Sequence, residues 1–68
     1  MTNIEFSTLV TRQASSLKIY AMRFTKDADD ANDLVQDTIL KAITYFNKFK
    51  EGTNLKGWLY TIMKNTFI

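Results

Sequence analysis

The chain has 68 residues, enough for one small domain, and its lack of Cys and His excludes a disulfide framework, thiolate chemistry and imidazole catalysis. The formal net charge of +2 is too small to indicate nucleic-acid binding by itself. No apolar run approaches the roughly 20 residues that cross a bilayer, and the N-terminus lacks the basic start and apolar stretch of a signal peptide, so we expect a cytoplasmic protein without membrane insertion.

The chain contains no Pro and only two Gly, which predicts long helices with few breaks. We expect three, packed as a small all-α bundle. The first should run from about residue 3 to 25, because Thr2 and Glu5 have capping-box spacing and apolar residues recur every three or four positions, although Gln13 interrupts the stripe. The apolar positions are Phe6, Leu9, Val10, Leu17, Tyr20, Ala21 and Phe24.

The second helix is expected from about residue 28 to 49, with Asp27 as its cap. At about 100° per residue, its apolar side holds Ala31, Leu34, Val35, Thr38, Ala42, Tyr45, Phe46 and Phe49. The opposite side holds Asp29, Asp33, Gln36, Asp37, Leu40 and Thr44. Leu40 is thus an apolar centre with a polar rim, which is typical of a docking patch, although single exposed leucines are also common on ordinary surfaces.

Residues 50–54 have turn composition, and Thr53 or Asn54 should cap a third helix. The apolar face of this helix contains Leu55, Trp58, Leu59, Ile62 and Thr66. The helical pattern still continues at the last residues, and no Gly, Asn or Pro stops it. We therefore expect a chain that has been cut short.

The carboxylates give little indication of catalysis or metal binding. Asp27 begins a segment like a calcium loop. Such a loop needs an oxygen ligand at its fifth position, Gly at its sixth and Glu at its twelfth, but these positions hold Ala31, Asn32 and Thr38. Asp33 and Asp37 lie one helical turn apart and could act as an acid/base pair, but we identify no further group that converges on them. The chain also lacks a Gly-rich phosphate loop, a catalytic triad and zinc-ligand spacing. We predict no enzyme, no metal site and no cofactor.

Charge is divided along the chain. Five Asp and no basic residue lie between residues 27 and 37, whereas five Lys and only one acid, Glu51, lie between residues 41 and 64. This division predicts two partners of opposite character. Lysines and aromatics alternate from Phe46 to Tyr60, and such a pattern suits a single nucleic-acid strand, because ammonium groups pair with phosphates and rings stack on bases. The rings could equally belong to the core, with the lysines as ordinary surface residues.

Two blocks at a fixed separation carry a resemblance to a known family. They are Asp33-Leu-Val-Gln36-Asp37 and Trp58-Leu-Tyr-Thr-Ile62-Met-Lys-Asn65. Together they resemble region 2 of bacterial sigma factors, in the extracytoplasmic-function (ECF) group of the sigma-70 family, and the similarity covers about residues 6 to 67. The resemblance implies that residues 1–68 form a single region 2 domain, expected to be a fragment of a longer sigma factor. Family members carry a second, promoter-reading domain, region 4, and nothing in these 68 residues corresponds to it.

The resemblance implies a transcription initiation factor that binds the RNA polymerase core and recognises and melts the promoter minus-ten element. Contact with the β′ clamp helices is implied for Asp33, Gln36 and Asp37, with Leu40 and Lys41 as neighbours. Contact with promoter DNA, mainly the non-template strand, is assigned to Lys48, Lys50, Glu51, Gly52, Thr53, Asn54, Lys56, Thr61, Lys64 and Asn65. Asn65 is the implied base contact, and Thr61 joins it because both lie beside Trp58 on the helical wheel. An anti-sigma factor is a further implied partner.

Two other functions stay open on the sequence. One is a helical adaptor that binds a partner helix through the Leu40 patch and has no nucleic-acid role. The other is a helix-turn-helix protein that reads duplex DNA. Lys56 and Gly57 also depart from the residues that the sigma family often has before the Trp, so the resemblance implies no particular base preference.

Overall fold

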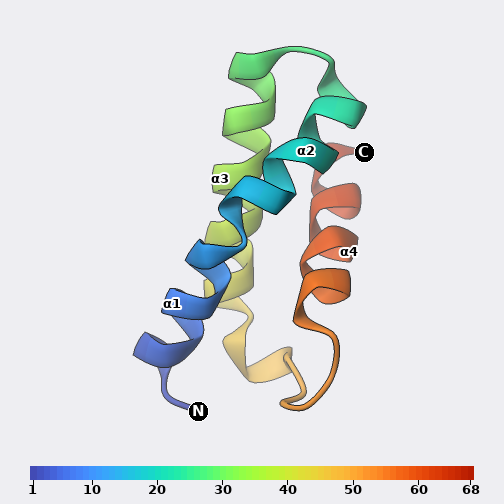
Figure 1. Cartoon of the computed structure of the whole chain (residues 1–68). Helices are drawn as coiled ribbons and strands as arrows, with labels where there is room; N and C mark the ends of the chain where they lie inside the picture. The colour runs from blue at the N-terminus through green and yellow to red at the C-terminus, as the bar shows by residue number, and fades with distance from the viewer.

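The computed structural model describes all 68 residues as four α-helices and one short 3-10 helix. The elements are α1 (Asn3–Arg12), α2 (Ala14–Thr25), α3 (Ala28–Thr44), η1 (Phe46–Lys48) and α4 (Leu55–Phe67). They confirm the predicted all-α class. The molecule is an elongated bundle of 34 × 18 × 17 Å, in which α1 and α2 run upward, α3 returns downward and α4 runs upward again (Figure 1).

The predicted helix starts are confirmed by their capping bonds. At the start of α1, the Thr2 hydroxyl accepts from the Glu5 N–H at 3.1 Å and the Glu5 carboxylate accepts from the Thr2 N–H at 2.9 Å. The Asp27 carboxylate accepts from two backbone N–H groups in the first turn of α3, at 2.9 and 3.0 Å. Of the two candidates for α4, Asn54 is the cap, and its side-chain oxygen accepts from the Gly57 N–H at 3.2 Å.

The expected single helix over residues 3–25 is wrong, because the chain breaks at Gln13 into α1 and α2. The Gln13 backbone has φ −85° and ψ −3°, and its N–H donates to the Val10 carbonyl three residues back, at 3.0 Å. The break allows α1 and α2 to bury separate apolar faces, which carry Phe6 and Val10 in α1 and Leu17 and Ala21 in α2.

The expected end of the second helix near residue 49 is also wrong. Helix α3 ends at Thr44, and the chain tightens into the 3-10 turn of η1. The wheel of 100° per residue therefore no longer applies after Thr44. Tyr45, expected on the apolar side, is 45% exposed, whereas Phe46 and Phe49 are half-buried as expected.

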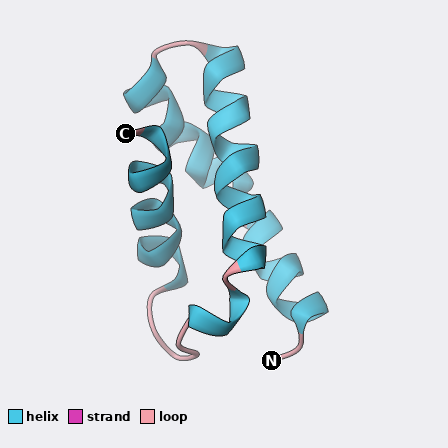
Figure 2. Cartoon of the chain, turned by 180° about the vertical axis from the view of Figure 1, so that it is seen from behind, coloured by secondary structure: helices cyan, strands magenta, loops and turns pink.

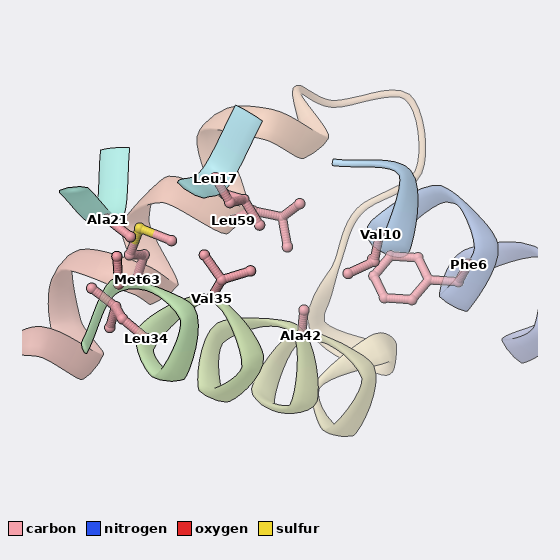
Figure 3. Close-up of a cluster of buried hydrophobic side chains, with 10 residues drawn as sticks. Phe6, Val10, Leu17, Ala21, Leu34, Val35, Ala42, Leu59 and Met63 are labelled. Carbon is pink, nitrogen blue, oxygen red and sulfur yellow. The ribbon is translucent and has the colours of Figure 1, made fainter. Parts of the chain in front are cut away.

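The core is built from ten buried apolar residues: Phe6, Val10, Leu17, Ala21, Ala31, Leu34, Val35, Ala42, Leu59 and Met63. Figure 3 shows Phe6 and Val10 at one end of this core, away from the aliphatic side chains around Met63. Met63 was missed by the sequence pattern. Thr38 is the one buried polar side chain, and its hydroxyl donates to the Leu34 carbonyl at 2.7 Å. None of the helices combines the length and apolar character that a membrane span requires.

Apart from the break at Gln13, the links between the helices lie at the two ends of the bundle (Figure 2). At one end, Lys26 joins α2 to α3 in the left-handed backbone region, with φ 58° and ψ 18°. This conformation is costly for a residue that carries a Cβ. At the other end, residues 49–54 join η1 to α4, near the N-terminus of the chain.

Candidate functional site

The predicted polymerase contacts lie on the outer side of α3. Helix α3 buries Leu34 and Val35 between α2 and α4, so Asp33, Gln36 and Asp37 face solvent. Neither of these two carboxylates takes part in an ion pair, since the one salt bridge of the chain joins the N-terminal ammonium to another residue. We call Asp33, Gln36, Asp37, Leu40 and Lys41 the α3 surface. All five side chains are exposed.

Leu40 of the α3 surface has an exposed apolar neighbour, Ile43, that the sequence analysis did not identify. Leu40 is 66% exposed, and Ile43, three residues further along the helix, is 37% exposed. Their spacing places them side by side on one helix face, which was the available signal for Ile43. Lys41 differs from its neighbours, because its ammonium donates to the Thr66 hydroxyl of α4 at 3.2 Å.

A hollow of about 340 Å³ borders the α3 surface where α3 meets the last turn of α4. Its lining residues are Phe24, Thr25, Asp30, Asp33, Leu34, Asp37, Thr66 and Phe67. The Phe24 and Phe67 rings stack with centroids 5.4 Å apart, so carboxylates stand beside an aromatic surface. This arrangement can accept a basic side chain whose aliphatic stem packs on the rings. Nowhere in the chain do three potential metal ligands among His, Cys, Asp and Glu converge.

The predicted DNA-binding loop, residues 50–54, is a compact turn at the lower end of the bundle (Figure 1). The Thr53 N–H and hydroxyl both donate to the Lys50 carbonyl, at 3.1 and 2.6 Å. Gly52 has φ 90°, a conformation that only glycine adopts without strain. Glu51 lies 3.7 Å from the N-terminal ammonium. All five loop residues are exposed, so their polar groups are accessible to a ligand.

The aromatic residues that flank the loop point into the protein. Phe46, Phe49 and Trp58 surround the Phe6 ring with centroid distances of 4.9, 5.5 and 5.9 Å. We call these four residues the aromatic cluster. In the stretch of alternating lysines and aromatics, Phe46, Phe49 and Trp58 therefore pack inward, whereas the lysines remain exposed. Base stacking on Phe49 or Trp58 is not favoured by this packing.

The predicted contacts on α4 are exposed on its outer side. Lys56, Lys64, Thr61 and Asn65 all face solvent. The Thr61 hydroxyl donates to the Gly57 carbonyl of its own helix at 3.0 Å. The Asn65 amide makes no hydrogen bond within the chain, so its donor and acceptor are both free for a ligand. Lys48, at the end of η1, is exposed as well.

A second hollow, of about 260 Å³, lies beside the loop and the first turn of α4. It is lined by Asn54, Lys56, Gly57 and two aromatic residues, Tyr20 and Tyr60, whose rings meet edge to face at 4.9 Å. The sequence analysis did not place Tyr20 at this site, because it read as a core residue of a distant helix, whereas Tyr60 ended the stretch of alternating lysines and aromatics. No carboxylate lines the hollow. The Asn54 oxygen is used by the cap, which leaves the Asn54 NH₂ group as a donor.

Comparison with known proteins identifies the family. The family model Sigma-70 region 2 matches residues 9–68. The chain is 44% identical over 52 residues to ECF RNA polymerase sigma factor EcfG of Rhodopseudomonas palustris, covering 76% of the chain and 29% of that protein. It is 41% identical over 49 residues to RNA polymerase sigma factor YlaC of Bacillus subtilis, covering 72% and 28%.

ECF RNA polymerase sigma factor SigG of Mycobacterium tuberculosis is 34% identical over 62 residues, covering 91% of the chain and 17% of that protein. The chain thus spans less than a third of the length of each of these relatives. The family match covers nearly the whole chain, and it includes both sequence blocks that carried the resemblance. The chain therefore belongs to the sigma-70 region 2 family, as the region 2 domain of an ECF sigma factor.

Proposed function

We propose that this domain links RNA polymerase to promoter DNA during transcription initiation and catalyses no reaction. The α3 surface docks on the clamp helices of the β′ subunit, and the loop of residues 50–54 with α4 holds the opened minus-ten element. The observation that carries the proposal is the free, exposed row of Asp33, Gln36 and Asp37 within a region 2 domain. These side chains contribute no ion pair to the fold, so they are available to bind a partner protein.

The DNA part of the proposal is supported by the groups around the loop. Lys48, Lys50, Lys56 and Lys64 are exposed and can neutralise phosphates. The free amide of Asn65 can pair with the edge of a base that has left the stack. Unstacking a base costs a few kcal/mol and least where pairing is weak. Opened promoter DNA, with its non-template strand against α4, therefore suits this surface better than closed duplex.

The polymerase contact can be tested by capture of a β′ clamp-helix fragment. The wild-type chain should retain the fragment, and both Asp33→Ala and Gln36→Ala should lose it, because each removes an exposed polar contact at the docking surface. Thr11→Ala is the control, since Thr11 is exposed on a different helix, α1, and is not part of the α3 surface. Equal capture by all four chains would remove the polymerase role.

The DNA contact can be tested by fluorescence anisotropy with a single-stranded minus-ten oligonucleotide and its duplex at low salt. The wild-type chain should prefer the single strand. Asn65→Ala should weaken binding about tenfold, the size of one good base contact, while Thr11→Ala should bind like wild type. Binding that ignores both strandedness and Asn65 would favour the adaptor alternative, for which the exposed Leu40 and Ile43 are the specific support.

An anti-sigma factor is the remaining predicted partner. A protein that covers the α3 surface would block polymerase docking, and one that covers the loop would block DNA binding. We propose such a protein as a competitor for one of these two surfaces. Competition with the clamp fragment or with the oligonucleotide, measured in the two assays above, would distinguish them.

A further inference from the structure

We propose that α1 acts as a brace for the DNA-binding loop, with Phe6 as a positioning residue that itself touches no DNA. The inference rests on the proposed DNA-binding role of residues 50–54. It assigns a function to a part of the chain that belongs to neither interface. Phe6 also lies outside residues 9–68, the part that the family model matches, so its role is not implied by the family match.

The Phe6 ring occupies the centre of the aromatic cluster. It is fully buried and lies 4.9 Å from the Phe46 ring, 5.5 Å from Phe49 and 5.9 Å from Trp58. These three partners come from η1, from the residue just before the loop and from the first turn of α4. Phe6 is thus the one ring of the cluster that comes from outside the segment containing the loop, and it contacts both sides of that segment.

Apart from the contacts of the aromatic cluster, the loop is restrained by the Thr53 hydroxyl bond to the Lys50 carbonyl, the Asn54 cap and the 3.7 Å contact of Glu51 with the N-terminal ammonium. Within it, the only backbone bond outside the helices runs from Thr53 to Lys50, and Gly52 adds conformational freedom. Phe49 and Trp58, whose rings lie 5.1 Å apart, anchor the two ends of the loop. A loop held in its binding conformation before the ligand arrives loses less entropy on binding and binds more tightly. Loss of the Phe6 ring should therefore weaken DNA binding through loop disorder.

Phe6 lies at the far end of the core from the residues that pack beneath Asp33 and Asp37. In Figure 3, Phe6 lies at the opposite end of the hydrophobic core from Met63, Ala21 and Leu34. Leu34 directly follows Asp33, whereas Phe6 packs against η1, beyond the other end of α3. A purely structural role for Phe6 would lower both binding activities together. A positioning role should lower DNA binding and leave clamp binding intact.

The first turn of α1 supplies a second way to loosen the brace. The Phe6 N–H donates to the Thr2 carbonyl at 3.0 Å, and the capping box of Thr2 and Glu5 fixes this turn. Both capping residues are exposed. Thr2→Ala therefore frays the turn that carries Phe6 without removing any buried side chain.

The test compares Phe6→Leu and Thr2→Ala with Leu17→Val, a matched loss of buried apolar volume elsewhere in the core. Phe6→Leu should weaken binding of single-stranded minus-ten DNA about tenfold, and Thr2→Ala should act in the same direction with a smaller effect. Both should capture the clamp fragment like wild type. Leu17→Val should leave both activities unchanged. Far-UV circular dichroism establishes that each variant is folded.

Trp58 is the only tryptophan of the chain and reports on the cluster directly. Without DNA, Phe6→Leu should shift its emission to the red and raise its quenching by acrylamide, whereas Asn65→Ala should change neither. DNA affinity within about twofold of wild type in both α1 variants, alongside weaker binding by Asn65→Ala, would overturn the brace alone. Equal loss of clamp and DNA binding in Phe6→Leu and Leu17→Val would also overturn it. A wild-type chain that binds no single-stranded DNA would overturn both proposals.

Discussion

Gly57 leaves space for the side chain of Asn54, which caps α4 and lines the hollow beside the loop. It is the third residue of α4, after the Asn54 cap. A Cβ at this position would stand 2.9 Å from the Asn54 side-chain nitrogen and 3.3 Å from its Cγ. Glycine is needed here for the space it leaves to Asn54.

For Gly57→Ala, two effects on stability should nearly cancel. Alanine gains about 1 kcal/mol of helix propensity, and displacement of the cap costs about the same. The free energy of unfolding in urea should thus stay within about 1 kcal/mol of wild type. Binding of single-stranded DNA should nevertheless fall, because the Asn54 amide leaves the hollow that it lines. Asn54→Ser, which keeps a capping oxygen without the amide, should also bind weakly; wild-type binding by both variants would exclude Asn54 from the DNA contact.

Glu5 gives the first turn of α1 a pH dependence. Hydrogen bonds from Thr2, first from its backbone N–H and then from its side chain, lower the pKa of the Glu5 carboxyl below its ordinary value. A group whose pKa is depressed by folding contributes stability above its ordinary pKa and loses it as the pH falls through the folded-state pKa. The wild-type chain should therefore lose α1 helicity over this acidic range.

Glu5→Gln is the control for this effect, because Gln can retain the capping bond without a titrating group. Circular dichroism from neutral to strongly acidic pH should show a smaller change in helicity for Glu5→Gln than for wild type. The same acid profile in both chains would mean that other carboxylates cause the change.

At the scale of elements, the link between α2 and α3 contains avoidable strain. Lys26 has φ 58°, a region that disfavours residues with a Cβ. Lys26→Gly should therefore stabilise the domain by about 0.5–1 kcal/mol, measured by urea unfolding. Lys18→Gly, an exposed position inside α2, should instead destabilise it by about 1 kcal/mol. Destabilisation by both substitutions would show that the Lys26 conformation is not a source of strain.

The sequence was sufficient to predict helices, caps and the polar side of α3, because these depend on neighbours within a few positions. It did not predict the break at Gln13, since glutamine is an acceptable helix residue and the break arises because α1 and α2 bury separate faces. It also could not place Tyr20 beside Tyr60, or Phe6 beside Trp58, because these pairs meet only in the folded chain. The assigned roles of the exposed site residues remain predictions.

At the scale of the whole molecule, negative charge lies along α3 and positive charge gathers around the loop and α4. The lysines assigned to phosphate contact predict steep salt dependence. With Lys48, Lys50, Lys56 and Lys64 engaged, the logarithm of the affinity for single-stranded DNA should fall with a slope of about −3 against the logarithm of salt concentration. Anisotropy titrations at several salt concentrations measure this slope.

Single substitutions test whether each lysine contributes. Lys64→Gln should reduce the magnitude of the slope by about 0.7, because one fewer counterion is released. Lys18→Gln, on the exposed side of α2, should leave it unchanged. A slope that is insensitive to Lys64 would place the strand elsewhere on the surface.

The hydrogen bond between Lys41 and Thr66 joins α3 to α4, the two helices for which we propose different ligands. The Thr66 hydroxyl donates to the Ile62 carbonyl at 2.7 Å and accepts from the Lys41 ammonium at 3.2 Å. Thr66 is also the immediate neighbour of Asn65. The Lys41 ammonium has three N–H donors, so it can bind a carboxylate on an incoming protein and keep its bond to Thr66. A protein bound at the α3 surface would then contact a lysine that is itself tied to α4, one residue away from Asn65.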